Sequence, residues 1–275
     1  MSVTVDLHSH SLYSHARDSV EAMAASAYAK GLKIFGFSEH SPRPDGYAYP
    51  KDYQEQLVAG FPDYVAEVLA ERERYAGRMD VLLALEMDYM PAEEAYAAQC
   101  VAAYPYDYVI GGLHFLGTWG FDWSLAEWEG LSEQTKREHF IRYYRDLRSM
   151  AECRLFHIAA HPDLVKLFCK ESFAAWVKED EAKGHIRAAL AAMKDAGMVM
   201  EISSAAIRKG LGEPYPCREV MALARELDVP ISFGSDAHAT EDVAYEFDTL
   251  AAYAKEYGYA KSAVFYEKEL SFREF

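Results

Sequence analysis

The sequence has little basic charge, few cysteines and no long apolar run. Its 275 residues include 28 lysines and arginines against 44 aspartates and glutamates, which gives a formal net charge of −16. This balance disfavours sequence-blind binding to DNA or to anionic lipid, because both partners need a basic face. A small anionic substrate in a local positive pocket is still compatible with it.

The scarcity of cysteine and of apolar runs excludes further classes. The four cysteines contain no C-x-x-C pair, and a chain of this length does not depend on a disulfide framework. No basic segment followed by an apolar one opens the chain, so we expect no signal peptide. The longest stretch without charged side chains, 108–121, is broken by four glycines and a histidine. We therefore expect a cytoplasmic protein that binds neither nucleic acid nor membrane, with homo-oligomerisation left open.

Apolar segments of strand length alternate with helical patterns along the whole chain. The expected strands are 4–8, 34–39, 81–86, 106–111, 155–160, 198–202 and 229–234. The expected helices are 19–30, 62–76, 92–103, 132–152, 173–196, 217–227 and 241–257. We expect Pro62 to open the second helix and Gly184 to interrupt the fifth. Seven such units form either a doubly wound sheet or a closed barrel. Because no linker divides them, we expect a single α/β domain over residues 1–275.

Most of the ten histidines fall where an expected strand passes into its loop. This set comprises His8, His10, His15, His40, His114, His161 and His238, together with the carboxylates Glu86 and Asp236. In an alternating α/β barrel all strand C-termini lie on one face, which carries the chemistry. Imidazole with carboxylate suits zinc, iron or manganese. Nine candidate ligands are too many for one tetrahedral ion and predict two or three divalent metal ions.

The remaining three histidines are not expected to bind metal, and the sequence lacks the motifs of other catalytic classes. His139 and His185 lie inside expected helices, and His157 lies deeper in its strand, so we expect packing or solvated roles for them. The sequence has no P-loop, no H-E-x-x-H and no complete G-x-S-x-G elbow. His40 stands where that elbow requires its second glycine.

The motifs, in their order, resemble the polymerase-and-histidinol-phosphatase (PHP) family of metal-dependent phosphoesterases. The matching segments are D-L-H-S-H at 6–10, S-E-H-S-P at 38–42, the lone Glu86, G-G-L-H-F at 111–115, A-H-P-D-L at 160–164 and G-S-D-A-H at 234–238. Residues 119–122, 201–202, 208–209 and 213–216 look most like the histidinol-phosphate phosphatase branch. The resemblance implies a distorted seven-stranded (βα)7 TIM-like barrel with its active site at the C-terminal ends of the strands.

The resemblance also implies a trinuclear metal centre in which Glu86 bridges two ions. Its three ligand groups are His8, His10, Glu86 and Asp236; Glu86, His114 and His161; and His15, His40 and His238. Two departures from the branch stand beside these matches. Residues 203–206 read S-S-A-A where N-T-x-G is usual, and Gly112 stands where serine is usual.

The activity implied is hydrolysis of a phosphate monoester, with L-histidinol phosphate as the favoured substrate and histidine biosynthesis as its setting. A hydroxide that bridges two metal ions would attack phosphorus, and Glu86 and Asp236 would be the catalytic carboxylates that hold those ions.

Substrate contacts are expected from the loops around the metal centre. Arg208 is the first choice for a bidentate phosphate clamp, Lys209 the second, and Arg17 a further contact. Asp122 and Trp119 are expected to supply a carboxylate and an aromatic wall to the ammonium and imidazole of histidinol phosphate.

Three alternatives stay open. The nearest is a PHP phosphoesterase that acts on nucleotides or short oligonucleotides. A barrel amidohydrolase also begins with H-x-H, but its final aspartate would lie on an eighth strand. A non-catalytic metal-binding module is the third, and a complete ligand set argues against it.

Overall fold

Seven parallel strands form the centre of the molecule in the computed structural model, which describes residues 3–47 and 50–275. Their spatial order is β1-β2-β3-β4-β7-β8-β9, and every neighbouring pair is parallel. The strands are β1 (Val5–Asp6), β2 (Ile34–His40), β3 (Asp80–Asp88), β4 (Tyr108–Gly112), β7 (Ile158–Ala159), β8 (Val199–Ser203) and β9 (Ile231–Gly234).

The first and last strands of this sheet meet and close it into a barrel. The Leu7 amide donates to the Phe233 carbonyl at 3.0 Å, and the His10 amide donates to the Ala237 carbonyl at 2.9 Å. A parallel bridge joins Ser9 to Ala237. The prediction of a seven-stranded TIM-like barrel is therefore confirmed, and the doubly wound alternative is excluded.

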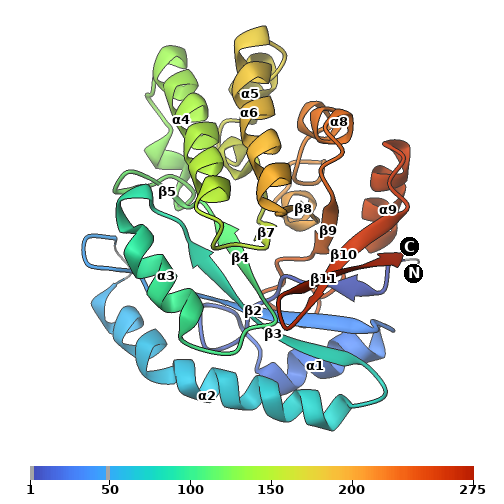
Figure 1. Cartoon of the computed structure of the whole chain (residues 1–275). Coiled ribbons are helices and arrows are strands. Elements are labelled where there is room, and N and C mark those ends of the chain that lie inside the picture. The colour runs from blue at the N-terminus through green and yellow to red at the C-terminus, as the bar shows by residue number, and fades with distance from the viewer. Residues whose placement is uncertain (1–2, 48–49) are drawn as a thin grey trace.

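Helices surround the barrel and connect its strands (Figure 1). They are α1 (Val20–Ala29), α2 (Lys51–Tyr75), α3 (Glu94–Ala102), α4 (Glu133–Glu152), α5 (Lys170–Trp176), α6 (Asp180–Ala196), α7 (Ala205–Arg208), α8 (Arg218–Glu226) and α9 (Phe247–Glu256). Their apolar faces bury the outer side of the sheet in one continuous core. None of the described helices is long and apolar enough to cross a membrane.

Three helix boundaries differ from prediction. The helix expected at 241–257 begins only at Phe247 as α9, and residues 241–246 form turns instead. Pro62 does not open the second helix but lies inside α2, which begins at Lys51. The buried residues Phe61, Tyr64 and Val65 hold the helix through this point, and tertiary packing thus outweighs the hydrogen bond that proline removes. Gly184 likewise lies inside α6, and the predicted fifth helix is interrupted at 177–179 instead.

Side chains fill the barrel interior below the strand C-termini. The Tyr108 hydroxyl crosses the barrel and donates to the Leu7 carbonyl at 2.6 Å. Gly36 makes this crossing possible, because a Cβ there would lie 1.7 Å from the Tyr108 hydroxyl oxygen. The interior of the barrel is therefore a packed core.

An antiparallel hairpin that the sequence analysis missed covers the N-terminal end of the barrel. It consists of β10 (Lys261–Tyr266) and β11 (Glu269–Glu274) (Figure 1). Phe265 is buried and its ring lies 6.1 Å from that of Tyr108. Burying such a side chain contributes about 1.5–3 kcal/mol to stability. A second small hairpin pairs β5 (Phe115–Leu116) with β6 (Trp119–Gly120) beside the opposite end.

Candidate metal centre

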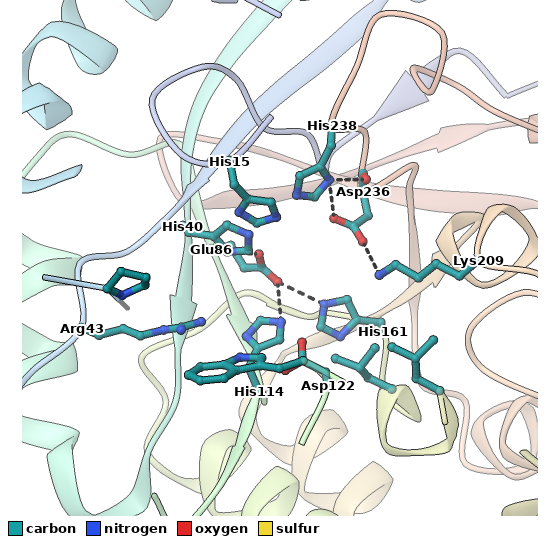
Figure 2. A pocket seen from close by; sticks show the side chains of 14 residues that line it. His15, His40, Arg43, Glu86, His114, Asp122, His161, Lys209, Asp236 and His238 are labelled. Atoms are coloured by element: carbon teal, nitrogen blue, oxygen red, sulfur yellow. Dashed lines mark hydrogen bonds and ion pairs between the residues drawn. The ribbon is translucent and has the colours of Figure 1, made fainter. Parts of the chain in front are cut away.

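Strand register brings the predicted ligands together at the C-terminal end of the barrel. His40, the last residue of β2, is the register partner of Glu86 on β3. His114 and His161 follow β4 and β7, and Asp236 follows β9. Because all these strands are parallel, their ends meet on one face. The structure thus places side chains from six strands around one space (Figure 2).

Glu86 stands at the centre of this arrangement with its two carboxylate oxygens facing different groups. Its Oε2 lies 3.4 Å from His8 Nε2, 3.5 Å from His10 Nε2 and 2.8 Å from His40 Nδ1. Its Oε1 lies 3.1 Å from His161 Nε2 and 3.8 Å from His114 Nε2. A carboxylate in this position can bridge two ions.

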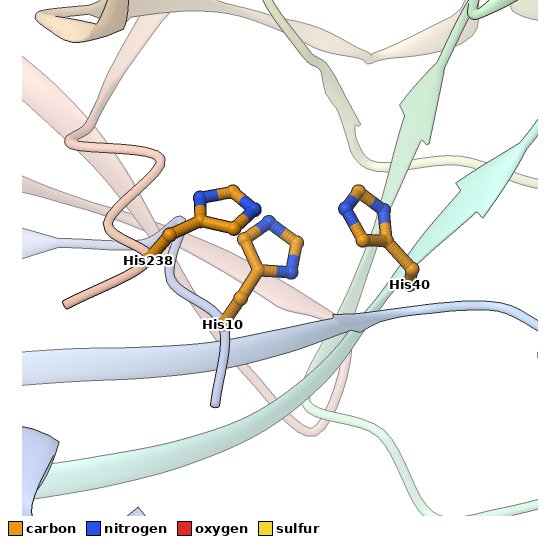
Figure 3. A group of neighbouring side chains, drawn as sticks. All are labelled: His10, His40 and His238. Atoms are coloured by element: carbon orange, nitrogen blue, oxygen red, sulfur yellow. The ribbon is translucent and has the colours of Figure 1, made fainter. Parts of the chain in front are cut away.

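Three groups of side chains offer ligand atoms within 4.8 Å of one another. They are His8, His10 and Asp236; Glu86, His114 and His161; and His10, His40 and His238 (Figure 3). The third group contains His10 where the resemblance implies His15. The exposed His15 ring stacks beside this group, with its centroid 4.9 Å from that of His40 and 4.4 Å from that of His238.

Glu201 on β8 supports two of the histidines, a role that the sequence analysis did not assign. Its Oε1 lies 2.7 Å from His8 Nδ1, and its Oε2 accepts a hydrogen bond from the His161 amide at 2.8 Å. Gly234 leaves room for this carboxylate, because a Cβ there would lie 2.0 Å from Glu201 Oε1. Glu201 thereby fixes the His8 ring so that Nε2 faces the centre.

Asp88 supports His114 in the same way from the end of β3. Its Oδ1 contacts His114 Nδ1, and its Oδ2 accepts from Arg43 Nε. Arg43 follows the S-E-H-S-P segment, and its guanidinium also lies over the Phe115 ring, 4.7 Å from the centroid. Asp88 lies two residues after Glu86 on the same strand, so both side chains point to the same face. That spacing was the available sequence signal for Asp88.

The electrostatics divide the histidines into two kinds. Burial lowers the pKa of His114, but the Asp88 carboxylate outweighs burial and raises this pKa to about 9. Burial also opposes the charge on His8, yet Glu201 and Glu86 bring its pKa well above the ordinary value. For His10, burial and the neighbouring His40 and His238 act together and hold the pKa well below the ordinary value.

Backbone strain and unpartnered ring nitrogens in the site are consistent with metal binding. Asp236 and His161 adopt φ angles of +50° and +24°, a region that favours glycine and costs about 1–3 kcal/mol. Among the described residues, both ring nitrogens of His10, His8 Nε2 and His238 Nε2 are buried without a hydrogen-bond partner. Buried polar atoms normally have a hydrogen-bond partner. The unpartnered nitrogens converge, and coordination to metal ions would supply the partner that each of them lacks.

Comparison with known proteins agrees with this geometry. The family model of the PHP domain matches residues 6–205. The chain belongs to the PHP family. A relative from Deinococcus radiodurans named "Probable histidinol-phosphatase" is 33% identical over 88% of this PHP chain and 89% of its own length. The histidinol-phosphatase of Bacillus subtilis is 25% identical over 85% and 92%.

A solved PHP-type structure shares the fold over nearly the whole chain. It is the histidinol phosphate phosphatase of Lactococcus lactis complexed with zinc, L-histidinol and phosphate. Its TM-score is 0.72 at 18% identity, and the match covers 98% of each chain.

A cavity of about 470 Å³ opens above the ligand groups of this PHP chain. Its polar walls include Asp122 and Lys209, and Lys209 Nζ lies 3.3 Å from Asp236 Oδ2. Arg43 enters from the side opposite Lys209 (Figure 2). Trp123, 53% exposed, stands at the rim. Asp122 and Lys209, both expected substrate contacts, thus line the cavity, and Arg43 and Trp123 are additions.

Three of the expected substrate contacts do not line this cavity of the PHP chain. Trp119 is not in the cavity wall, because its ring packs 4.6 Å from that of His139 and its Nε1 donates to Glu127 at 3.0 Å. Arg208 donates to the backbone carbonyls of Ser235 at 3.0 Å and Asp236 at 2.6 Å.

Arg17 also lies outside the cavity wall. With Arg208 it lines a neighbouring hollow, and it forms an ion pair with Glu241 there. His15, Lys209 and His238 line both this hollow and the cavity, so the two arginines lie beside candidate metal ligands although neither lines the cavity itself.

Proposed function

We propose that this PHP chain is a metal-dependent phosphomonoesterase that hydrolyses L-histidinol phosphate to L-histidinol and phosphate in histidine biosynthesis. The names of the relatives from D. radiodurans and B. subtilis and the ligands of the L. lactis structure support this assignment. The observation that carries it is Glu86, whose two oxygens face two ligand groups at the floor of a small cavity. We further propose that residues 1–275 act as one cytoplasmic barrel domain.

The proposed metal ligands follow from the three groups. They are His8, His10, Glu86 and Asp236 for the first ion, Glu86, His114 and His161 for the second, and His40 and His238 with His15 or His10 for the third. When bound, zinc, iron or manganese ions supply Lewis-acid stabilisation of phosphoryl charge and activation of the attacking water. Glu201 and Asp88 keep the His8 and His114 rings oriented for this purpose.

Two cations flank the position of the phosphoryl group. Lys209 and Arg43 approach the cavity from opposite sides and can neutralise non-bridging phosphate oxygens. Arg208 acts indirectly, because its hydrogen bonds to the Ser235 and Asp236 carbonyls hold the strained Asp236 backbone in place.

The remainder of the cavity favours a cationic substrate. Asp122 Oδ1 is buried and has no hydrogen-bond partner among the described residues. An ammonium or imidazolium donor satisfies this oxygen with a charge-assisted hydrogen bond, which is stronger than the bond that a neutral hydroxyl of a nucleotide or sugar phosphate would make. Trp123 at the rim supplies an aromatic face for the imidazole.

Phosphate release across a substrate panel tests the proposal. We expect turnover of L-histidinol phosphate to exceed that of nucleotides, sugar phosphates and p-nitrophenyl phosphate by at least about 10²-fold. Chelation should abolish activity, and added Zn, Mn or Fe should restore it. Equal turnover of nucleotides would favour the nucleotide alternative, and activity that persists after complete metal removal would refute the metal mechanism.

Asp122→Asn tests the substrate assignment separately from the metal chemistry. We expect KM for histidinol phosphate to rise about tenfold, because a charge-assisted hydrogen bond is lost, with p-nitrophenyl phosphate hydrolysis unchanged. Asp146→Asn on α4, outside the cavity wall, is the matched control. An unchanged KM for histidinol phosphate would remove Asp122 from the substrate site.

A further inference from the structure

The outer strand of the C-terminal hairpin is an exposed edge that the proposed activity does not use. Every residue of β11 except Ser271 is exposed, and Leu270 and Phe272 are 41% and 45% exposed. In the part of the chain that the structure describes, β11 pairs with β10 alone. Such an edge offers unpaired backbone groups to another strand.

The hairpin is held firmly against the N-terminal end of the barrel. The Tyr266 hydroxyl donates to Asp80 at 2.6 Å, and the Lys268 amide donates to the Asp107 carbonyl at 2.7 Å. At the other end of β11, the Phe275 ring lies 4.8 Å from that of Phe233. The edge is therefore presented by a strand anchored at both ends.

The ladder between β10 and β11 determines which backbone groups point outward. The Phe275 amide donates to the Ala260 carbonyl at 3.3 Å, which continues the pairing of Glu274 with Lys261. Hydrogen-bonded and non-hydrogen-bonded pairs alternate along an antiparallel ladder. The amides and carbonyls of Leu270 and Phe272 consequently point away from β10. The exposed Arg273 guanidinium donates to the Phe272 carbonyl at 3.1 Å, a contact that pairing with another strand would replace.

We propose that β11 pairs antiparallel with β11 of a second copy of this chain, on a two-fold axis through Ser271. This register places Leu270 opposite Phe272 of the other copy, so their outward amides and carbonyls hydrogen-bond each other. Their apolar side chains become cross-strand neighbours on one face. The two hairpins then form one continuous four-stranded sheet.

Charge complementarity favours this register and favours a second copy of β11 as the partner strand. With the axis at Ser271, Glu269 faces Arg273 of the other copy, and Lys268 faces Glu274, each twice because of the two-fold symmetry. With the axis at Phe272, neither Glu269 nor Arg273 has an opposite charge across from it. The strand is thus complementary to itself in one register.

The pairing lies at the end of the barrel away from the metal centre. The hairpin contacts residues at the start of β3 and just before β4, whereas the ligands follow the strand ends. Both active sites stay open in the dimer. Because two six-residue strands bury a small area, the dimer should be concentration-dependent.

Sedimentation velocity of the full chain over a wide concentration range tests the proposal. We expect a monomer–dimer equilibrium in the wild type. Arg273→Glu should weaken it by at least about tenfold, because carboxylates then face each other at both ends of the paired strands. The double variant Glu269→Arg/Arg273→Glu should restore it. Arg148→Glu on α4 is the matched charge-reversal control and should leave the equilibrium unchanged.

Phosphate release separates loss of pairing from loss of folding, because the hairpin lies at the end opposite the active site. Each variant should keep wild-type turnover per chain. A wild type that stays monomeric at every concentration would overturn the proposal. So would a dimer that Arg273→Glu leaves intact, or a double variant that stays as weak as the single one.

Discussion

The mouth of the barrel contains two kinds of histidine. His8 and His114 each have the nitrogen that faces away from the centre bound to a buried carboxylate, from Glu201 and Asp88. Among the described residues, neither ring nitrogen of His10 has a hydrogen-bond partner. Its ring centroid lies 4.1 Å from that of His40 and 4.4 Å from that of His238. The pKa of each supported ring is raised by its carboxylate, whereas that of His10 is lowered.

The difference shows two ways to prepare a ligand. A carboxylate orients its histidine before any ion arrives and increases the basicity of the ligating nitrogen. A cluster of imidazoles is held by packing, and burial together with the neighbouring imidazoles lowers the pKa of His10 within it. We therefore expect the loss of kcat/KM to be largest at Glu86, which contacts both kinds of histidine. It should be smaller at the supporting carboxylates Glu201 and Asp88, and smallest at His15, at the edge of the imidazole cluster.

The largest effect is expected from Glu86→Gln, because Glu86 contacts both kinds of histidine. Loss of its charge should lower kcat/KM by about 10³-fold and reduce the metal content after dialysis. Phosphate release and metal analysis measure the two effects. Glu71→Gln, at a buried carboxylate on α2, is the matched control and should retain both. Full metal content in Glu86→Gln would contradict the bridging role.

Glu201→Gln should be next, with metal affinity and kcat/KM lowered by about 10²-fold. A neutral amide cannot both orient the His8 ring and accept from the His161 amide as the carboxylate does. Metal titration of the chelated protein measures the affinity. A change of less than about twofold would mean that packing alone orients His8.

Asp88→Asn should cost less, about tenfold in kcat/KM, because this carboxylate supports one ligand rather than two. The substitution also removes the negative charge that pairs with Arg43, so part of the loss should appear as a higher KM for the phosphomonoester. Steady-state kinetics separate the two parameters. A loss as large as that of Glu86→Gln would place Asp88 among the direct ligands.

The smallest effect is expected from His15→Asn, at the exposed edge of the imidazole cluster. Because the three ligand groups form without His15, kcat/KM should fall by less than about tenfold, and at most one ion per chain should be lost. Metal analysis decides this directly. Loss of two ions would show that the cluster does not hold together without His15.

The alternation of strands and helices predicted the clustered ligands, because strand-end position alone brings them to one face. It left a doubly wound sheet and a closed barrel open, and the family resemblance favoured the barrel. The sequence did not reveal the roles of Glu201 and Asp88, because a buried carboxylate on a strand looks the same whether it faces a histidine or an arginine. The choice between Trp119 and Trp123 depended on how a short hairpin folds, with Trp119 packed on His139. The terminal hairpin was missed because its strands follow the seventh repeat, where the alternating pattern ends.

By itself, the sequence determined which residues gather at the mouth of this protein, because the period of a strand and the alternation of strands and helices fix their face and end. It also determined that this mouth is suited to divalent metal ions, through the chemistry of imidazole and carboxylate. Only the tertiary structure decided which nitrogen of each histidine faces the centre, which arginines enter the cavity and which edge stays exposed. Those outcomes depend on contacts between residues far apart in the chain, such as Glu201 with His8 across the barrel.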